Sequence, residues 1–501
     1  MSNKWDKGDS STQNSTEDGG DTKPVYTLWH GYDVVLTDNC HPSETRRKDS
    51  SPPEEEKDNA SASQTSSNKP IVRRKSSDQL NDYGWLRQLD LRSDIPSITE
   101  VLDWSFDVLR FEETVLIQVF ISLLEYYNLL EKFHLDRTLL ERYCKEVMNM
   151  HHKDCHYQKI DIKKEGGVIV KEGEDKPDIL CEYHNWYHAI SCAHTSFLFL
   201  ALGGADAFLN PIDLFCILMS ALIHDLDHPG TNSDFEVKRS SSLAKLYDND
   251  AVLERHSINM GLSLCQQNPD LNWLKSFNKN DQEYVKDFIT EAVLATDPGR
   301  HGGIVKDALA FVEEGPRDYQ QTSTSPQGES KESDVQCSSS SSTYFDINNQ
   351  THRIFIGRLI LHAADISNPI QNSFEVAADW GIRVTTEFSR QAKKEEELQL
   401  PVTEFMAGLD SQYKIAKLQI GFFNFMVKPL FHTIGILFPK LKMLEEWGEK
   451  NSVEYQAVID AVDLEQKIEK GQMESASLQD KEEEGLDDSV YKKVKKNESS
   501  F

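Results

Sequence analysis

The sequence predicts an all-α fold, a compact multi-helix domain flanked by disordered tails. From about Leu91 apolar residues recur every three or four positions, as in VLIQVFISLLEYYNLLEKF, which is the spacing of amphipathic helices. No comparable stretch of strict apolar–polar alternation follows, so strands are not expected in the ordered part. Before that point the chain is polar and has too few large apolar residues to build a core.

These changes in composition divide the chain into three parts. We expect a disordered tail over residues 1–90, a helical domain over 91–455 and a charged tail over 456–501. Two polar insertions interrupt the helical pattern. Residues 154–182 contain glycines and predict a loop or a small hairpin, and residues 313–346, with the run SSSSS, predict a mobile surface loop.

The overall charge and the cysteines limit the class of protein. With 54 basic and 83 acidic residues the formal charge is -29, which disfavours nucleic-acid binding because phosphate backbones attract basic surfaces. The 8 cysteines occur singly, without a C-x-x-C pair, as expected for free thiols in a reducing compartment. We find no apolar signal segment and no run near the roughly 18 apolar residues of a membrane span. We therefore expect a cytoplasmic protein with no membrane span.

A candidate regulatory site lies in the N-terminal tail. Three basic residues precede two serines in VRRKSSDQL, a pattern that suits a basophilic kinase acting on Ser76 or Ser77. The sequence is also compatible with a homodimer.

The stretch ALIHDLDHPG, residues 221–230, places two histidines and two aspartates within five positions. It ends the segment IDLFCILMSALI, for which Asn210 and Pro211 supply an N-cap and a first-turn proline. Because that segment is apolar on all sides, it predicts a buried helix that stops at the Pro-Gly pair. Carboxylates are unfavourable at a helix C-terminus and costly when buried, so the sequence favours a bound cation there.

Two further buried helices carry similar groups near one end. His184 and His188 are four residues apart in YHNWYH and are expected on one helix face. His362 and Asp365 lie in the last turn of RIFIGRLILHAAD. Together, imidazoles and carboxylates form a mixed ligand set that suits zinc, iron or manganese. His194 and His362 are also consistent with hydrogen-bonded core residues, His362 alternatively with a place just outside the metal ligands.

In this order, the motifs resemble the catalytic domain of class I 3′,5′-cyclic nucleotide phosphodiesterases, within the wider HD hydrolases. The resemblance rests on Y-H-N-x-x-H, H-D-x-D-H-P-G, L-E-x-H, A-T-D and D-I-S-N-P followed by Q-I-G-F, and it covers roughly residues 91–447. It implies an all-α catalytic domain with a dinuclear metal site. The chain departs from the pattern at Arg255 and Ser257, where many members have Asn and His.

The resemblance implies hydrolysis of cyclic nucleotides to 5′-monophosphates in cyclic nucleotide signalling, with two metals activating a water and a histidine protonating the 3′-oxygen. The metals implied are one tight zinc ion and one exchangeable magnesium or manganese ion. By motif position, His184 is the general acid, the metal ligands are His188, His224, Asp225 and Asp365, and the residues that hold the metal's waters are His228, Glu254 and Thr296.

Substrate binding is assigned, again by resemblance, to the helix KLQIGFFNFMVKPLFHTIGILFP. Gln419 and Phe422 are three residues apart and share a face, where the amide can bond a purine edge and the ring can stack on it. Further substrate-side positions match Tyr183, Asn368 and Val384. Residues 374–380 and 428–439 look most like the high-affinity, cGMP-selective subgroup, so we expect cGMP to be preferred over cAMP.

Two other functions remain open at this point. An HD-type phosphohydrolase acting on another nucleotide or phosphate ester would share the metal ligands, but not Tyr183-His184-Asn185 together with Gln419 and Phe422. A non-catalytic cyclic nucleotide sensor would keep the fold, yet neither a ligand nor the acid is missing from this chain.

Overall fold

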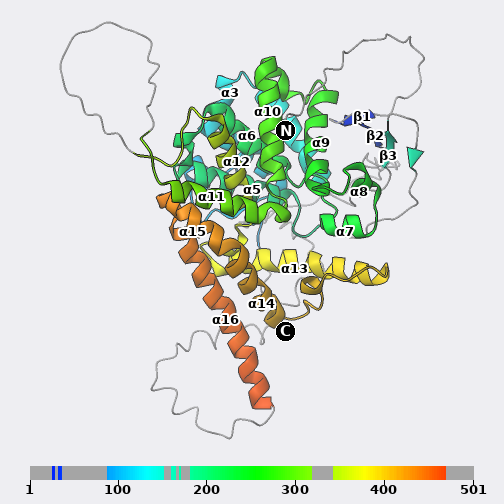
Figure 1. The fold of residues 1–501 in the computed structure, drawn as a ribbon, viewed down its shortest axis with the longest axis vertical. Helices are drawn as coiled ribbons and strands as arrows, with labels where there is room; N and C mark the ends of the chain where they lie inside the picture. The colour runs from blue at the N-terminus through cyan, green and yellow to red at the C-terminus, as the bar shows by residue number, and fades with distance from the viewer. Residues whose placement is uncertain are drawn as a thin grey trace, which may run out of the picture.

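The computed structural model of the chain describes residues 25–28, 32–36, 87, 89–151, 160–164, 169–170, 181–318 and 342–469 (Figure 1). The predicted kinase site at Ser76 and Ser77 lies outside these residues, as does most of the predicted N-terminal tail. Apart from four short strands, the described part of the chain is built from helices, which confirms the all-α prediction for the domain.

Sixteen α-helices are described, with short 3₁₀ turns between several of them. Their bounds are α1 Ile98–Val101, α2 Glu113–Tyr126, α3 Leu129–Lys132, α4 Arg137–His151, α5 Trp186–Ala201, α6 Pro211–Ile223, α7 Ser233–Lys238, α8 Ser242–Leu246, α9 Val252–Gln267, α10 Lys279–Leu294, α11 His301–Glu314, α12 Gln350–Asp365, α13 Phe374–Glu397, α14 Gln412–Phe422, α15 Lys428–Leu437 and α16 Met443–Glu469.

The core is centred on α5, α6, α10 and α12, which pack together in the middle of the molecule (Figure 1). The helix α6 shows why the sequence folds this way. Asn210 and Asp213 form a reciprocal capping box, Pro211 occupies the first turn, and every residue from Asp213 to Ile223 is buried. The predicted buried helix is therefore confirmed, and it delivers His224 to the interior at its C-terminal end.

A four-stranded antiparallel sheet lies beside α9 (Figure 1), in the order β1 Val25–Leu28, β2 Tyr32–Leu36, β3 Ile160–Lys164 and β4 Ile169–Val170. Of the loop or small hairpin expected within residues 154–182, the antiparallel β3–β4 pair matches the hairpin. The strands β1 and β2 correct the prediction of disorder for that part of the N-terminal tail. Strand β2 pairs along its length with β3, and so distant a partner cannot be read from a short apolar run.

The structure also corrects both ends of the predicted domain. Arg87, within the predicted tail, forms ion pairs with Asp107 at 2.6 Å and with the buried Asp379 of α13 at 3.2 Å. At the other end α16 continues to Glu469, and Tyr455 and Ile459 are buried against α14. The packed domain thus starts by Arg87 and extends past the predicted boundary at residue 455.

The surface loop predicted over residues 313–346 spans fewer residues than expected, because both of its ends are ordered. A backbone bridge between Arg317 and Thr343 closes it, and Phe345 is only 1% exposed, between Phe311 and Phe438. Residues 319–341 lie outside the described part.

The helices α14 and α15 are joined without a break by a π-helical turn, Phe423–Val427. This turn accommodates Pro429, which has no N–H to donate and would clash with the preceding turn of a regular helix. By length and composition alone, the stretch Gln412–Leu437 is a candidate membrane span, since an 18-residue window within it has a mean hydropathy of 1.4. Since its residues Leu430, Phe431 and Ile434 are buried in the domain core, the packing fits a helix of the folded domain.

Candidate active site

Three helices bring the predicted metal ligands to one point. His188 lies in the first turn of α5, His224 and Asp225 directly follow α6, and Asp365 is the last residue of α12. These four residues form a group whose ligand atoms all lie within 4.8 Å of one another. The structure thus brings together residues from 188 to 365 that the sequence separates.

The four atoms are spaced as the corners of a coordination shell. His188 Nε2 lies 3.0 Å from Asp365 Oδ1 and 3.3 Å from Asp225 Oδ2. His224 Nε2 lies 3.1 Å from Asp225 Oδ2, 3.3 Å from Asp365 Oδ1 and 3.3 Å from His188 Nε2. The centre of a tetrahedron with such edges is about 2 Å from each corner, which is the bond length of zinc to nitrogen and oxygen ligands. The residues present therefore fit a divalent metal ion.

The charges of these four residues also favour a bound metal ion. Burial disfavours the ionised form of Asp225, but His224 and His188 outweigh it and keep the pKa of this carboxyl well below its usual range. Burial would lower the pKa of His224, yet the charge of Asp225 raises it well above its usual range. The carboxylates thus require positive charge at this point, which a metal ion held by neutral imidazoles supplies.

The predicted acid, His184, lies beside this group but not on the helix face expected for it. Asn185 is the N-cap of α5, so His184 precedes the helix, and its ring centroid is 5.9 Å from that of His188. Its position is fixed by Glu387 of α13, whose Oε2 lies 2.6 Å from His184 Nδ1. The other oxygen, Oε1, accepts from the backbone N–H groups of Tyr183 and His184.

This contact keeps His184 charged. Burial lowers its pKa, but the charge and hydrogen bond of Glu387 outweigh burial and raise the pKa of His184 to about 9. Glu387 is 1% exposed and belongs to no motif named above, so it was not predicted as a site residue. A signal was present, since Trp380, Val384 and Glu387 recur at helical spacing on one face of α13.

His228 lies against the predicted acid, and its predicted role in holding the metal's waters stays a prediction. Its ring stacks on that of His184, with centroids 3.9 Å apart and planes inclined by 25°, and its Nδ1 accepts from Gly230 N–H at 3.1 Å. Burial and the charge of His184 lower the pKa of His228 to about 3. A neutral imidazole therefore covers one face of the charged one.

Asp227, the second aspartate of the H-D-L-D-H stretch, does not join the metal group. It adopts a left-handed backbone conformation with φ of 62°, and its Oδ2 lies 2.8 Å from Nε2 of the buried His256 in α9. On the next residue of α9, Ser257 Oγ donates to Leu226 O at 2.9 Å. Successive residues of α9 thus hold the turn between the metal ligands and His228, and Ser257 has a structural contact although it departs from the family pattern.

Of the residues expected to hold metal-bound waters, Glu254 fits best. Burial, with the nearby carboxylates of Asp297 and Asp225, raises the pKa of Glu254 to about 7, and Ser233 Oγ donates to it at 3.4 Å. Thr296 is buried, and its hydroxyl donates to Val293 O at 2.8 Å. The role predicted for Thr296 stays a prediction.

The predicted substrate residues are buried or half-buried in the described part of the chain. Tyr183 packs its ring 4.5 Å from that of His188, and its hydroxyl accepts from the Asn368 amide. Gln419 is 6% exposed in α14, facing Gly381 of α13. Both Val384 and Phe422 are half-buried.

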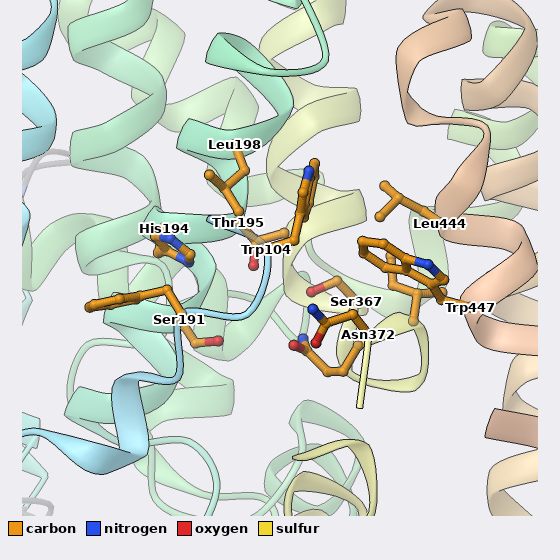
Figure 2. Close-up of a pocket in the computed structure, with 12 residues that line it drawn as sticks. Trp104, Ser191, His194, Thr195, Leu198, Ser367, Asn372, Leu444 and Trp447 are labelled. Atoms are coloured by element: carbon orange, nitrogen blue, oxygen red, sulfur yellow. The ribbon is translucent and has the colours of Figure 1, made fainter. Parts of the chain in front are cut away.

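Figure 2 shows a separate pocket farther along α5, between that helix, the N-terminal segment and α16. His188, Ser191, Thr195 and Leu198 follow one stripe of α5, and the last three line this pocket. Trp104 and Trp447 form aromatic walls in edge-to-face contact at 5.8 Å. None of the predicted ligands or substrate residues lines it.

Known proteins are similar to this chain in sequence and in fold. The family described as 3′5′-cyclic nucleotide phosphodiesterase matches residues 183–446, more than half of the chain. The phosphodiesterase domain of Salpingoeca rosetta rhodopsin phosphodiesterase has a similar structure, with a TM-score of 0.60 and 25% identity over 73% of this chain and 94% of that domain.

Two cyclic nucleotide phosphodiesterases are also similar to this chain in sequence. The chain is 24% identical over 357 residues to the 3′,5′-cyclic-nucleotide phosphodiesterase regA of Dictyostelium discoideum, covering 71% of this chain and 38% of regA. It is 26% identical over 353 residues to the dual specificity calcium/calmodulin-dependent 3′,5′-cyclic nucleotide phosphodiesterase 1C of Mus musculus, covering 69% of this chain and 41% of the relative. The chain spans about two fifths of the length of these relatives. From the matched region and the site it contains, the chain belongs to the 3′5′-cyclic nucleotide phosphodiesterase family.

Proposed function

We propose that this protein hydrolyses 3′,5′-cyclic nucleotides to 5′-monophosphates. The observation that carries the proposal is the pairing of two features within one site. Four nitrogen and oxygen atoms converge at 3.0–3.3 Å, and a histidine with a raised pKa lies beside them. Phosphodiester hydrolysis needs these two functions, a positive centre at the phosphate and an acid for the leaving oxygen.

His188, His224, Asp225 and Asp365 would hold the first metal, which we propose to be zinc because the set mixes imidazole and carboxylate. Asp225 would also bridge to a second ion, magnesium or manganese, which prefers oxygen ligands and water. Bound metals would supply charge neutralisation and a water of lowered pKa as nucleophile. Glu254, buried beside Asp225, would orient such a water.

His184 would act as the general acid. Its Nδ1 is occupied by Glu387, which leaves Nε2 to donate a proton to the 3′-oxygen as its bond to phosphorus breaks. Glu387 would be a positioning residue that keeps the imidazole charged and fixes its orientation. His228, stacked on the same ring, would restrict its motion.

Gln419 and Phe422 would bind the base, with Val384 on the opposite side and Asn368 at the polar edge. A methyl group added at Gly381 would lie 3.3 Å from Gln419 Nε2 and 3.0 Å from Tyr455 Oη, so both groups border the same space. A phenol hydroxyl donates and accepts, so Tyr455 can support either orientation of the Gln419 amide. Preference between guanine and adenine is therefore not decided by Gln419 alone.

We propose cGMP as the preferred substrate, on the likeness of residues 374–380 and 428–439 to the cGMP-selective subgroup. Competition between cGMP and cAMP at subsaturating concentrations measures the ratio of kcat/KM values. A ratio favouring cAMP tenfold or more would contradict the preference and leave the hydrolase assignment standing.

The identity of the product tests the assignment of the acid. Release of the 5′-monophosphate requires protonation at the 3′-oxygen, as expected for His184. A 3′-monophosphate would place the acid on the other side of the phosphate and would contradict it.

We also propose a cytoplasmic location, supported by the free thiols of the five cysteines in the described part of the chain. Cell fractionation tests this directly, and recovery in a secreted or membrane fraction would contradict it.

A further inference from the structure

A second group of metal-binding side chains lies beside the four-ligand cluster. It consists of His184, His228 and Glu387, which each offer one ligand atom within 4.8 Å of the other two. It shares no residue with the first cluster. Glu387 is buried, whereas the side chain of His184 is 22% exposed, so the group can be reached from solvent.

We propose that His184, His228 and Glu387 form a second transition-metal site, which binds zinc and inhibits the enzyme. Two imidazole nitrogens and one carboxylate oxygen are a common zinc donor set with one position left open. Magnesium and manganese prefer oxygen ligands and would not compete well for two imidazoles. The site would therefore respond to free zinc in the presence of abundant magnesium.

Zinc binding at this site needs only a local rearrangement of side chains. Glu387 is held by two backbone N–H groups through Oε1, while Oε2 faces His184 Nδ1 at 2.6 Å. Zinc entering here would displace the proton between these two atoms, and that proton would leave to solvent. The imidazoles now stack face to face, so His228 has to turn about Cβ–Cγ, a torsion with broad minima, and give up its contact with Gly230.

The inhibition rests on the function proposed above, because zinc at Nδ1 would break the contact with Glu387 that fixes the His184 ring, whose Nε2 would donate the proton. Zinc binding itself does not depend on that function. The two statements can therefore be tested apart, first by counting bound metal and then by measuring turnover.

Bound zinc is counted by equilibrium dialysis of the metal-loaded protein in saturating magnesium, for the parent and three variants. In Glu387→Gln the carboxylate is replaced by a poor ligand, while in His228→Phe an aromatic ring stays on His184 without a nitrogen. His432→Phe is the matched control, since His432 is an exposed imidazole 3.1 Å from a carboxylate oxygen of Glu445. Cobalt as a visible-absorbing substitute reports whether the additional ion is held by nitrogen and oxygen in a tetrahedral site.

We expect the parent and His432→Phe to bind one more zinc than Glu387→Gln, and His228→Phe to bind it at least about 10-fold more weakly. Turnover of the parent should fall as this ion binds. Equal zinc binding by the parent and Glu387→Gln would overturn the site. Stoichiometric binding without any turnover at any zinc concentration would instead contradict the proposed hydrolase function.

Discussion

Two regions along α5 contain buried histidines in opposite roles. In the first turn, His188 faces two carboxylates and a second imidazole, and the group has the spacing of metal ligands. Six residues later, His194 Nε2 lies 2.7 Å from the backbone oxygen of Val101, in the neutral surroundings of the pocket in Figure 2. Burial lowers the pKa of His194 to about 4, so it is an uncharged core residue.

The difference shows that the partner atoms decide what a buried histidine does. The protein alone satisfies His194, since a backbone carbonyl accepts its proton. At His188 the neighbouring carboxylates carry charge that only a cation or additional protons can balance. The following changes test this contrast between the charged and the neutral end of α5.

The largest effect is expected at the charged end. Asp365→Ala removes one metal ligand and should lower kcat/KM about 10³-fold or more, because the metal contributes several kcal/mol to stabilising the transition state. His194→Gln, at the neutral end of the same helix, should keep activity within a few-fold. Comparable losses of kcat/KM in both variants, measured on folded protein, would contradict the contrast between the two ends of α5.

A smaller loss is expected at the acid. His184→Ala should retain the metal and lose about 10²–10⁴-fold in turnover, the range typical of a placed general acid. Because the pKa of His184 is about 9, activity should persist through neutral pH and fall above that value as the proton is lost.

Glu387→Gln sharpens this test, since it removes the charge that raises the pKa of His184. The high-pH limb of the kcat/KM profile should then move to lower pH. A limb that stays in place would show that Glu387 does not act through His184.

The neutral end of α5 packs against the N-terminal segment, and Arg87 anchors that segment to the domain. Deleting residues 1–79 should leave a folded, active domain. Deleting residues 1–90 should cost a further 3 kcal/mol or so in the free energy of unfolding, because Asp107 and the buried Asp379 lose their shared cation. Equal stability of the two truncations in urea unfolding would show that this ion pair is dispensable.

The smallest effect appears only in acid. A neutral His194 stabilises the fold fully above its ordinary pKa of 6.5, and this contribution is lost as pH falls from about 6.5 towards 4. The loss is at most about 3 kcal/mol. His194→Gln should show a flatter decline of stability over this range, whereas His432→Gln at the surface should follow the parent. Identical curves for the parent and His194→Gln would contradict the assignment.

Local signals at helix ends predicted where a cation would lie, whereas the choice of the four ligands came from the resemblance to the family. Pro211 and Asn210 start α6, a Pro-Gly pair ends its turn, and Asp365 closes an apolar run. The four side chains then meet because the three helices pack together in the core.

Other parts of the site depend on contacts between distant segments and could not be read in this way. Glu387 reaches His184 from a helix about two hundred residues later, and its spacing from Trp380 and Val384 marks a shared helix face but not the partner. The contact of Asp227 with His256 depends on a left-handed turn and on a helix about thirty residues later, so the H-D-L-D-H stretch alone does not show it. The strands β1 and β2 depend in the same way on a partner far along the chain.

The proposed hydrolysis of cyclic nucleotides depends on a metal ion held by His188, His224, Asp225 and Asp365. Its most direct test is the release of 5′-monophosphate from cGMP and cAMP before chelation, after chelation and after divalent metal is restored. We expect turnover that the chelator abolishes and that zinc with magnesium recovers. Turnover that persists after the metal has been removed, or none from protein shown to be folded and metal-loaded, would contradict the account.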